Sequence, residues 1–217
     1  MAVTLLTALY GGYDNLSSLP DGHGFDRALC VTDSSGLSAA GWDVSVEPSD
    51  GHYRLAAKRP KLMPFRFVEE DVAVWVDASV TIVRDDFKDY CLASLGDNDL
   101  IASPHPENRY CLFEEAAYCQ DWPQNRHMPL REQTAFYRAE GMPERFGLWA
   151  CAILVWRNTE ASRRFGDAWF AENERWSTRD QVSFPYLLWK MQPKFGTFDW
   201  HQFNNPYVRY QPHLKRR

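Results

Sequence analysis

Short apolar runs separated by turn-forming residues mark the first half of the chain. Their pattern predicts five strands, over residues 3–10, 28–31, 42–46, 72–76 and 100–103. The run at 72–76 is β-branched and aromatic, as in a strand covered on both faces of a sheet. A helix over residues 85–95, stopped by Gly96, is predicted between the last two strands. Strands that alternate with helices and turns favour parallel pairing, so we expect an α/β fold.

The second half interrupts this alternation and then resumes it. Residues 104–143 hold several prolines that break the segment into short amphipathic pieces, which we interpret as an excursion over the face that carries the site. A buried strand over 149–156 and an amphipathic helix with Trp169 on its apolar face follow. A final helix is predicted to begin near Ser177. Since no repeat or linker is evident, we expect one domain over residues 1–217.

Composition fits a folded α/β protein and indicates the cellular compartment to expect. The chain has 217 residues, of which 45% are hydrophobic and 15% aromatic, enough for one sizeable core. No apolar run approaches the roughly 20 residues that span a bilayer, and residues 1–9 lack the basic start of a secretory signal. Five scattered cysteines without a CxxC pair favour reduced thiols. We therefore expect a cytoplasmic protein without a membrane span, and the net charge of −5 argues against a nucleic-acid partner.

An acidic residue ends the most apolar strand, and it is the first candidate for chemistry. Asp77 follows the 72–76 run, at the sheet edge where open α/β sheets bind ligands. If the chain stays extended, Asp77 and Ser79 point the same way and could share one cation or a hydrated phosphate. Oxygen ligands of this kind suit Mg²⁺ or Mn²⁺. The alternative is that Asp77 caps a turn and Ser79 bonds the backbone.

Two further segments suit a nucleotide with phosphates. Lys58, Arg59 and Lys61 lie in a basic stretch before the Asp77 strand and would balance phosphate charge, although a solvated basic turn explains them equally well. The YGGYD loop after the first strand offers backbone N–H groups at Gly11 and Gly12, with aromatic rings for a nucleobase at Tyr10 and Tyr13. A hairpin-like turn is the alternative for this loop.

A carboxylate in the excursion is a candidate base. Glu115, beside Glu114, could accept the proton of an acceptor hydroxyl or orient the acceptor. Adjacent carboxylates on a helix point apart, so at most one of them faces a site, and a solvated helix face is the favoured alternative. His105 lies in a loop between two prolines and is either a metal ligand or a fixed loop residue.

The order of these motifs resembles a known family. YGGYD, KRPKLMP, VWVDAS, WACAILVWRN and RDQVSF follow one another as in nucleotide-sugar glycosyltransferases of GT-A fold. More closely, the chain resembles the glycosyltransferase-like domain family of plant mucilage hexosyltransferases and their bacterial relatives, over about residues 5–189. The resemblance implies a Rossmann-like, mostly parallel sheet flanked by helices. Residues 1–100 would form the nucleotide-binding half, and residues 101–217 the half that binds the sugar and the acceptor.

The resemblance also implies roles for individual residues. Asp77, with Ser79 in place of the second carboxylate of an Asp-x-Asp pattern, would bind Mn²⁺ or Mg²⁺, and a late histidine, His201 or alternatively His213, would complete the ligands. The YGGYD loop would contact the base and ribose, and Asp33 would add a polar contact there. Asp180 and Gln181 would hold the sugar in the catalytic site, although Ser177 to Asp180 also fits a capping box that only starts a helix.

Three functions remain open from the sequence. The leading hypothesis is transfer of a hexose from a nucleotide sugar, which we expect to be linked to UDP, to a glycan or another hydroxyl acceptor. A non-catalytic carbohydrate- or nucleotide-binding module suits the missing second carboxylate and the many tryptophans. A metal-assisted hydrolase built on Asp77, His105 and Asp180 is the third hypothesis.

Overall fold

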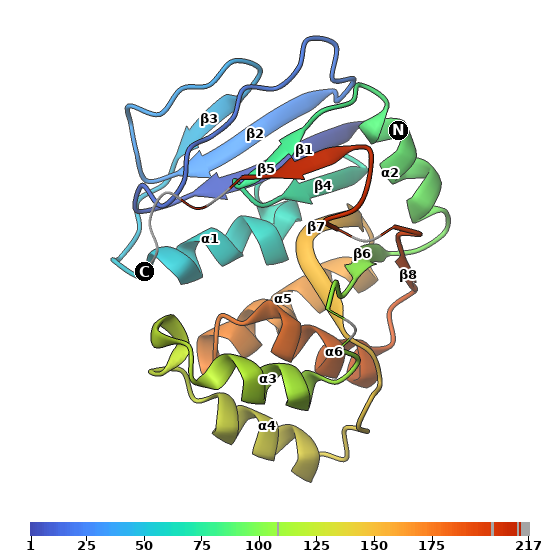
Figure 1. The fold of residues 1–217 in the computed structure, drawn as a ribbon. Helices are drawn as coiled ribbons and strands as arrows, with labels where there is room; N and C mark the ends of the chain where they lie inside the picture. The colour runs from blue at the N-terminus through green and yellow to red at the C-terminus, as the bar shows by residue number, and fades with distance from the viewer. Residues whose placement is uncertain (108, 201, 212, 214–217) are drawn as a thin grey trace.

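The computed structural model describes residues 1–107, 109–200, 202–211 and 213, and they form an α/β fold (Figure 1). Seven strands make one sheet in the order β3-β2-β1-β4-β7-β6-β8, and a two-stranded ribbon pairs β5 with β9. The strands are β1 Val3–Leu9, β2 Arg27–Thr32, β3 Asp43–Val46, β4 Val72–Val76, β5 Val80–Ile82, β6 Leu100–Pro104, β7 Trp149–Arg157, β8 Phe195–Thr197 and β9 Val208–Tyr210. The α-helices are α1 Tyr53–Leu62, α2 Phe87–Leu95, α3 Leu112–Gln120, α4 Leu130–Ala139, α5 Glu160–Arg175 and α6 Asp180–Met191. Short 3-10 turns η1 (Pro64–Arg66) and η2 (Pro123–Asn125) complete the elements.

Most pairs of neighbouring strands in the large sheet are parallel, so the expected fold class is confirmed. β1 pairs in parallel with β2 and β4, as does β2 with β3 and β6 with β8. The exception is β7, which runs antiparallel to both β4 and β6. The apolar run predicts this strand but not its direction. Its reversal brings the start of β7 to the same edge as the carboxyl end of β4, where the Asp77 amide donates to the Ala152 carbonyl at 2.9 Å.

Both faces of β4 are covered, which explains its uninterrupted apolar sequence. Ala73 and Trp75 face the layer built from α1, α3, α5 and α6, whereas Val72, Val74 and Val76 face α2 and the β5–β9 ribbon. All five side chains are buried, so the strand buries apolar area on both sides of the sheet. Asp77 is therefore the first position of this segment with access to solvent.

The excursion between β6 and β7 is part of the same domain. It supplies α3, η2 and α4, and Figure 1 shows these elements beside α5 and α6, below the sheet in that view. Tyr137 of α4 stacks on Tyr186 of α6 with ring centroids 3.8 Å apart. Three residues from the end of α3 and η2 line the cavity described below: Trp122, Gln124 and Asn125. In the described part of the chain, no helix has the length and apolar character needed to cross a bilayer.

We expect the close contact between α1 and α5 to be sensitive to one added methyl group. A Cβ on Gly166 of α5 would lie 2.2 Å from the Leu62 carbonyl oxygen at the end of α1. Gly166→Ala should therefore lower the free energy of unfolding by about 1–3 kcal/mol, because overpacking forces the two helices apart. Urea denaturation measures the change. Gly36→Ala, where an added Cβ meets nothing within 4 Å, is the control, and equal stability of the two variants would contradict the packing argument.

Candidate functional site

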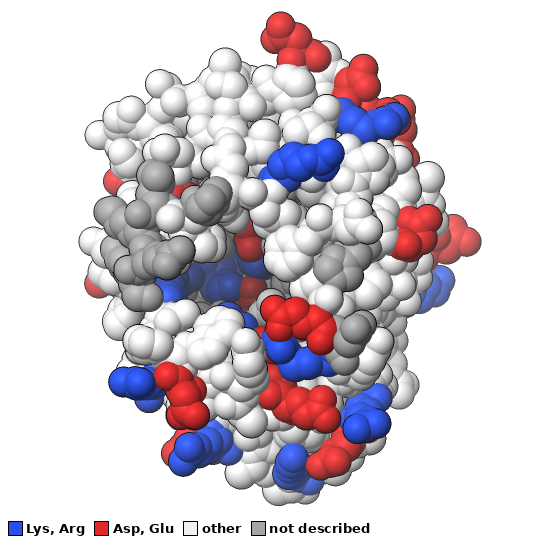
Figure 2. Space-filling view, in the orientation of Figure 1, with Lys and Arg blue, Asp and Glu red and all other residues white. Residues whose placement is uncertain are grey.

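A cavity of about 620 Å³ opens where the sheet meets the helical layer. It collects residues from the ends of β1 and β4, from α1 and η2, from the start of β7 and α6, and from the C-terminal segment. Figure 2 shows a hollow in this face of the molecule, with basic and acidic side chains in its depth. Its position at the carboxyl ends of β1 and β4 is where open α/β sheets bind ligands.

Two lysines and two carboxylates alternate at the base of this cavity. Lys58 and Lys61 lie three residues apart on α1 and point to the same side. The Lys61 ammonium lies 3.0 Å from Asp77 Oδ1 and 2.8 Å from Asp180 Oδ2, and Lys58 Nζ lies 2.5 Å from the same Asp180 oxygen. Four residues that the sequence nominates separately thus form one network, which we call the lysine–aspartate cluster.

The lysine–aspartate cluster sets the charge of its members. Burial raises the pKa of Asp180, but the charges and hydrogen bonds of Lys58 and Lys61 outweigh it and lower that pKa to about 2. Burial likewise disfavours charge on Lys61, yet Asp180 and Asp77 together raise its pKa above the usual value. For Lys58 burial prevails and lowers the pKa, with Asp180 offsetting only part of the effect. An anion that enters the cavity would favour the charged form of Lys58.

Asp77 presents one carboxylate oxygen to the protein and one to the cavity. Oδ1 accepts hydrogen bonds from Lys61 and from Trp75 Nε1, at 3.0 and 2.8 Å. Oδ2 accepts none from the residues that the structure describes, and the side chain is 37% exposed. The backbone turns directly after it, with the Val80 amide donating to the Asp77 carbonyl at 2.8 Å. The expectation of an extended Asp77–Ser79 segment is therefore wrong, although both residues line the cavity.

The donor set for a metal is small. Among the described residues no group of three or more His, Cys, Asp or Glu side chains could hold an ion, and His201 lies outside those residues. His213, the other late histidine, lies 2.9 Å from Asp14 at the cavity rim. Asp77 Oδ2 and the Ser79 hydroxyl fit a Mg²⁺ or Mn²⁺ ion only where water and substrate phosphates supply its other ligands, a mode that Mg²⁺ commonly adopts.

The YGGYD loop is held in place by Asp33. Its carboxylate accepts from the Gly11 amide, with both oxygens at 3.1 Å. Gly11 and Gly12 have positive φ angles of 64° and 55°, and a Cβ on Gly11 would lie 2.8 Å from the Tyr53 ring. The structure places Tyr10 and Tyr13 at the cavity wall, whereas Asp33 is not among the lining residues and acts on the loop.

The basic stretch is helical, so the solvated turn considered for it is wrong. Lys58, Arg59 and Lys61 lie within α1, which also contains Pro60. The two lysines face the cavity, but Arg59 leaves the other side of the helix, where its guanidinium lies 5.8 Å from the Phe170 ring centroid. Arg59 lines a separate groove and not this cavity.

The capping-box alternative for the start of α6 is also wrong. The N-cap residue is Arg179, and no side chain caps the helix. Ser177 instead donates to Gln133 Oε1 at 2.6 Å. Asp180 faces the lysines, its Oδ1 is buried without a hydrogen-bond partner among the described residues, and Gln181 lines the cavity beside it.

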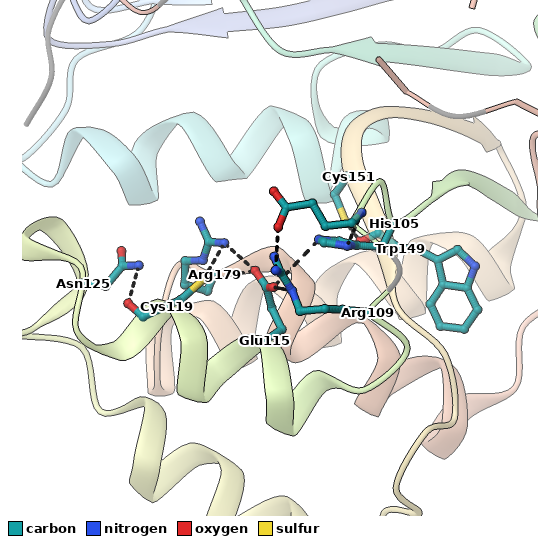
Figure 3. Close-up of polar contacts among 9 residues, drawn as sticks. His105, Arg109, Glu115, Cys119, Asn125, Trp149, Cys151 and Arg179 are labelled. Atoms are coloured by element: carbon teal, nitrogen blue, oxygen red, sulfur yellow. Dashed lines mark hydrogen bonds and ion pairs between the residues drawn. The ribbon is translucent and has the colours of Figure 1, made fainter. Parts of the chain in front are cut away.

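Glu115 lies behind the cavity wall and is buried, so a solvated helix face does not describe it. Its side chain is 2% exposed, and its carboxylate lies 2.8 Å from Arg109 Nε and 2.9 Å from an Arg179 terminal nitrogen (Figure 3). His105 is 3.8 Å from the same carboxylate. Neither Glu115 nor His105 is among the residues that line the cavity. A base role for Glu115 stays a prediction, and the hydrolase hypothesis lacks the His105 that it requires at Asp77 and Asp180.

Arg54 and Arg179 are among the cavity-lining residues that sequence reasoning missed. Trp122, one of the tryptophans that suit sugar stacking, lines the cavity as well. Arg179 directly precedes Asp180 in the RDQVSF motif, which is a signal that the sequence offers. Its guanidinium carbon lies 5.6 Å from the Trp122 ring centroid, so the two residues form one wall. Trp122 sits between prolines in the excursion, and nothing local in the sequence assigns it to the site.

Comparisons with known proteins found a matching family model and several solved structures of similar fold. The model of the TOD1/MUCI70, glycosyltransferase-like domain family matches residues 44–210. A CMP:2-keto-3-deoxy-manno-octonic acid synthetase complexed with CTP superposes with a TM-score of 0.47 and 12% identity, over 91% of this chain and 89% of that one. Mouse xyloside xylosyltransferase 1 in its apo form superposes with a TM-score of 0.48 and 8% sequence identity, over 91% of this chain and 84% of that one. The bifunctional IspDF from Campylobacter jejuni superposes with a TM-score of 0.44 and 10% sequence identity, over 93% of this chain and 50% of that one. No curated protein matches the sequence.

The lysine–aspartate cluster predicts a specific acid dependence of stability. Because the folded-state pKa of Asp180, about 2, lies below its ordinary value of 3.8, its ionised form stabilises the fold above pH 4. This contribution, about 2 kcal/mol, is lost as pH falls from 4 towards 2. Asp180→Asn should lack that component, as urea denaturation at stepped pH would show. Asp97→Asn, at an exposed position, should titrate like the wild type; an identical pH profile for Asp180→Asn would contradict the argument.

Proposed function

Because the chain belongs to the TOD1/MUCI70 glycosyltransferase-like domain family, we propose that it transfers a hexose from a UDP-linked sugar to a hydroxyl group of a glycan or another acceptor. The observation that carries this proposal is the lysine–aspartate cluster at the base of the cavity. A diphosphate leaving group gains negative charge as its bond to the sugar breaks. Ammonium groups fixed beside it stabilise that charge without reorganisation.

The two halves of the chain supply different parts of the proposed donor site. Tyr10 and Tyr13 lie at the cavity wall near the ends of the first strands, where a nucleobase can stack on an aromatic face. Asp180 and Gln181 lie across the cavity, at the start of α6. Both residues line the cavity, where a carboxylate and an amide can form hydrogen bonds with sugar hydroxyls. We assign residues 1–100 chiefly to the nucleotide and 101–217 chiefly to the sugar and acceptor.

A divalent ion is part of this proposal. Asp77 Oδ2 and Ser79 would hold Mn²⁺ or Mg²⁺ together with the donor phosphates, and His201 is proposed as a further ligand. The ion would supply additional positive charge against the diphosphate. Lys61 already neutralises part of the Asp77 carboxylate, so we expect the ion to bind weakly until the diphosphate arrives.

A binding module without turnover is the second candidate. It is favoured by the state of Asp180, whose low pKa of about 2 makes it a poor proton acceptor at neutral pH. Release of UDP from a UDP-sugar in the presence of acceptor distinguishes the two candidates, because a binding module would bind the donor and leave it intact. We also propose a cytoplasmic setting, which the five buried cysteines without disulfides suit.

Ligand-induced stabilisation tests the proposed donor. UDP with Mn²⁺, at about 100 times the dissociation constant, should stabilise the fold by about 2.7 kcal/mol, which corresponds to a rise in Tm of about 5–10 °C for a chain of this size. Asp77→Asn should remove the part of the shift that requires Mn²⁺, because it removes the charge that holds the ion. Calorimetry with UDP alone, Mn²⁺ alone and both separates these contributions.

Asp97→Asn is the matched control, because it removes a carboxylate at an exposed position away from the cavity. Its Tm shift with UDP and Mn²⁺ should equal that of the wild type. Absence of any shift with UDP or with another nucleoside diphosphate would overturn the proposed function. A full shift that is retained in Asp77→Asn would refute the metal role alone.

A further inference from the structure

Arg179 is a cavity-lining cation that is held from outside the cavity. One terminal nitrogen of its guanidinium donates to Glu115 Oε1 at 2.9 Å and lies 3.3 Å from Cys119 Sγ. The face of the group lies over the Trp122 ring. The other terminal nitrogen makes no hydrogen bond to a described residue, and the buried Nε also lacks a partner among them. One edge of the guanidinium is thus fixed, while its remaining donors are unused.

Glu115 is suited to fix that edge. It is buried on α3, and Figure 3 shows its carboxylate between Arg179 on one side and Arg109 on the other. Burial raises its pKa, but the hydrogen bond from Cys119 and the charges of Arg179 and Arg109 outweigh burial and lower it. Glu115 therefore stays ionised at neutral pH. Arg179 pairs with Oε1 and Arg109 with Oε2, so Arg179 keeps its own carboxylate oxygen when Arg109 is changed.

The two lysines and Arg179 differ in where the carboxylates that neutralise their charge lie. Lys58 and Lys61 each contact a carboxylate that itself lines the cavity, so part of their charge is neutralised at the ligand's position. The partner of Arg179 lies behind the wall and is shared with Arg109. Arg179 adds a further cation to the cavity lining, and a guanidinium presents paired N–H donors in a geometry that fits phosphate oxygens.

We propose that Arg179 binds the diphosphate of the donor and that Glu115 is its positioning residue. The inference rests on the proposed function and goes beyond it by adding a ligand contact and a support that acts through it. In this role Glu115 supports Arg179 and does not itself contact the diphosphate. Its effect on ligand affinity passes through the orientation of Arg179.

The two arginines on Glu115 provide a matched pair of variants. Arg179 lines the cavity and Arg109 does not, although their distances to the carboxylate are nearly equal, 2.9 and 2.8 Å. Calorimetric titration with UDP should show that Arg179→Gln weakens binding about 10- to 100-fold, the range for a hydrogen bond to a charged group. Arg109→Gln should leave UDP affinity within about twofold, whatever it does to stability. Uridine without phosphates should bind both variants and the wild type equally.

A double-mutant cycle tests whether Glu115 acts through Arg179. Glu115→Gln alone should weaken UDP binding, and the same change in the Arg179→Gln background should have no further effect, because coupled residues are not additive. Arg179→Lys keeps the charge and should restore part of the affinity. Should Glu115→Gln fail to fold, Glu115→Asp serves in its place, with circular dichroism as the check on every variant.

The outcomes separate this inference from the function on which it rests. A wild-type protein that binds no nucleoside diphosphate overturns both. UDP binding that Arg179→Gln leaves unchanged overturns only the inference. Equal losses of UDP affinity in Arg109→Gln and Glu115→Gln would show that Glu115 acts on general stability, and this result would also overturn the positioning role.

Discussion

One ammonium group, that of Lys61, connects the three elements on which the site depends. It joins α1 to the end of β4 through Asp77 and to the start of α6 through Asp180. A buried lysine is tolerated only where carboxylates compensate its charge. The end of β4 and the start of α6 must therefore both lie beside Lys61. Gly166 of α5 packs closely against the Leu62 carbonyl at the end of α1, so a side chain at position 166 would displace the helix that carries Lys61.

This arrangement limits the chemistry that each residue can perform. Asp180 is ionised and contacts two ammonium groups, which makes it an electrostatic and hydrogen-bonding residue. Asp77 shares one oxygen with Lys61 and Trp75 and keeps the other for the cavity. The two carboxylates therefore offset charge on the lysines of the cluster before a ligand enters, and a phosphate-bearing ligand changes the electrostatics of the site more than a neutral one does.

Local patterns in the sequence predicted six of the seven strands of the large sheet, all but β8, and part of the site. Asp77 stood out because an acidic residue ended a fully apolar strand, and β4 ends one residue before it. The helix that carries Lys58 and Lys61 was missed because Pro60 reads as a helix breaker, although it lies in the last turns of α1. Glu115 read as solvated because its partners, Arg109 and Arg179, come from a loop and from a helix much later in the chain. Contacts of that kind depend on the tertiary fold and leave no local pattern.

The reversed direction of β7 has a consequence for how this architecture can diversify. Since β6 and β7 are antiparallel neighbours, the whole excursion between them is topologically an enlarged hairpin connection, entering and leaving at one edge. Its length and content can change without altering the register of the strands that carry Asp77 and the lysines. The wall formed by Trp122 therefore belongs to a segment whose two ends are both fixed by the β6–β7 pair. The pairing of Glu115 with Arg179 and the stacking of Tyr137 on Tyr186 both join this segment to α6.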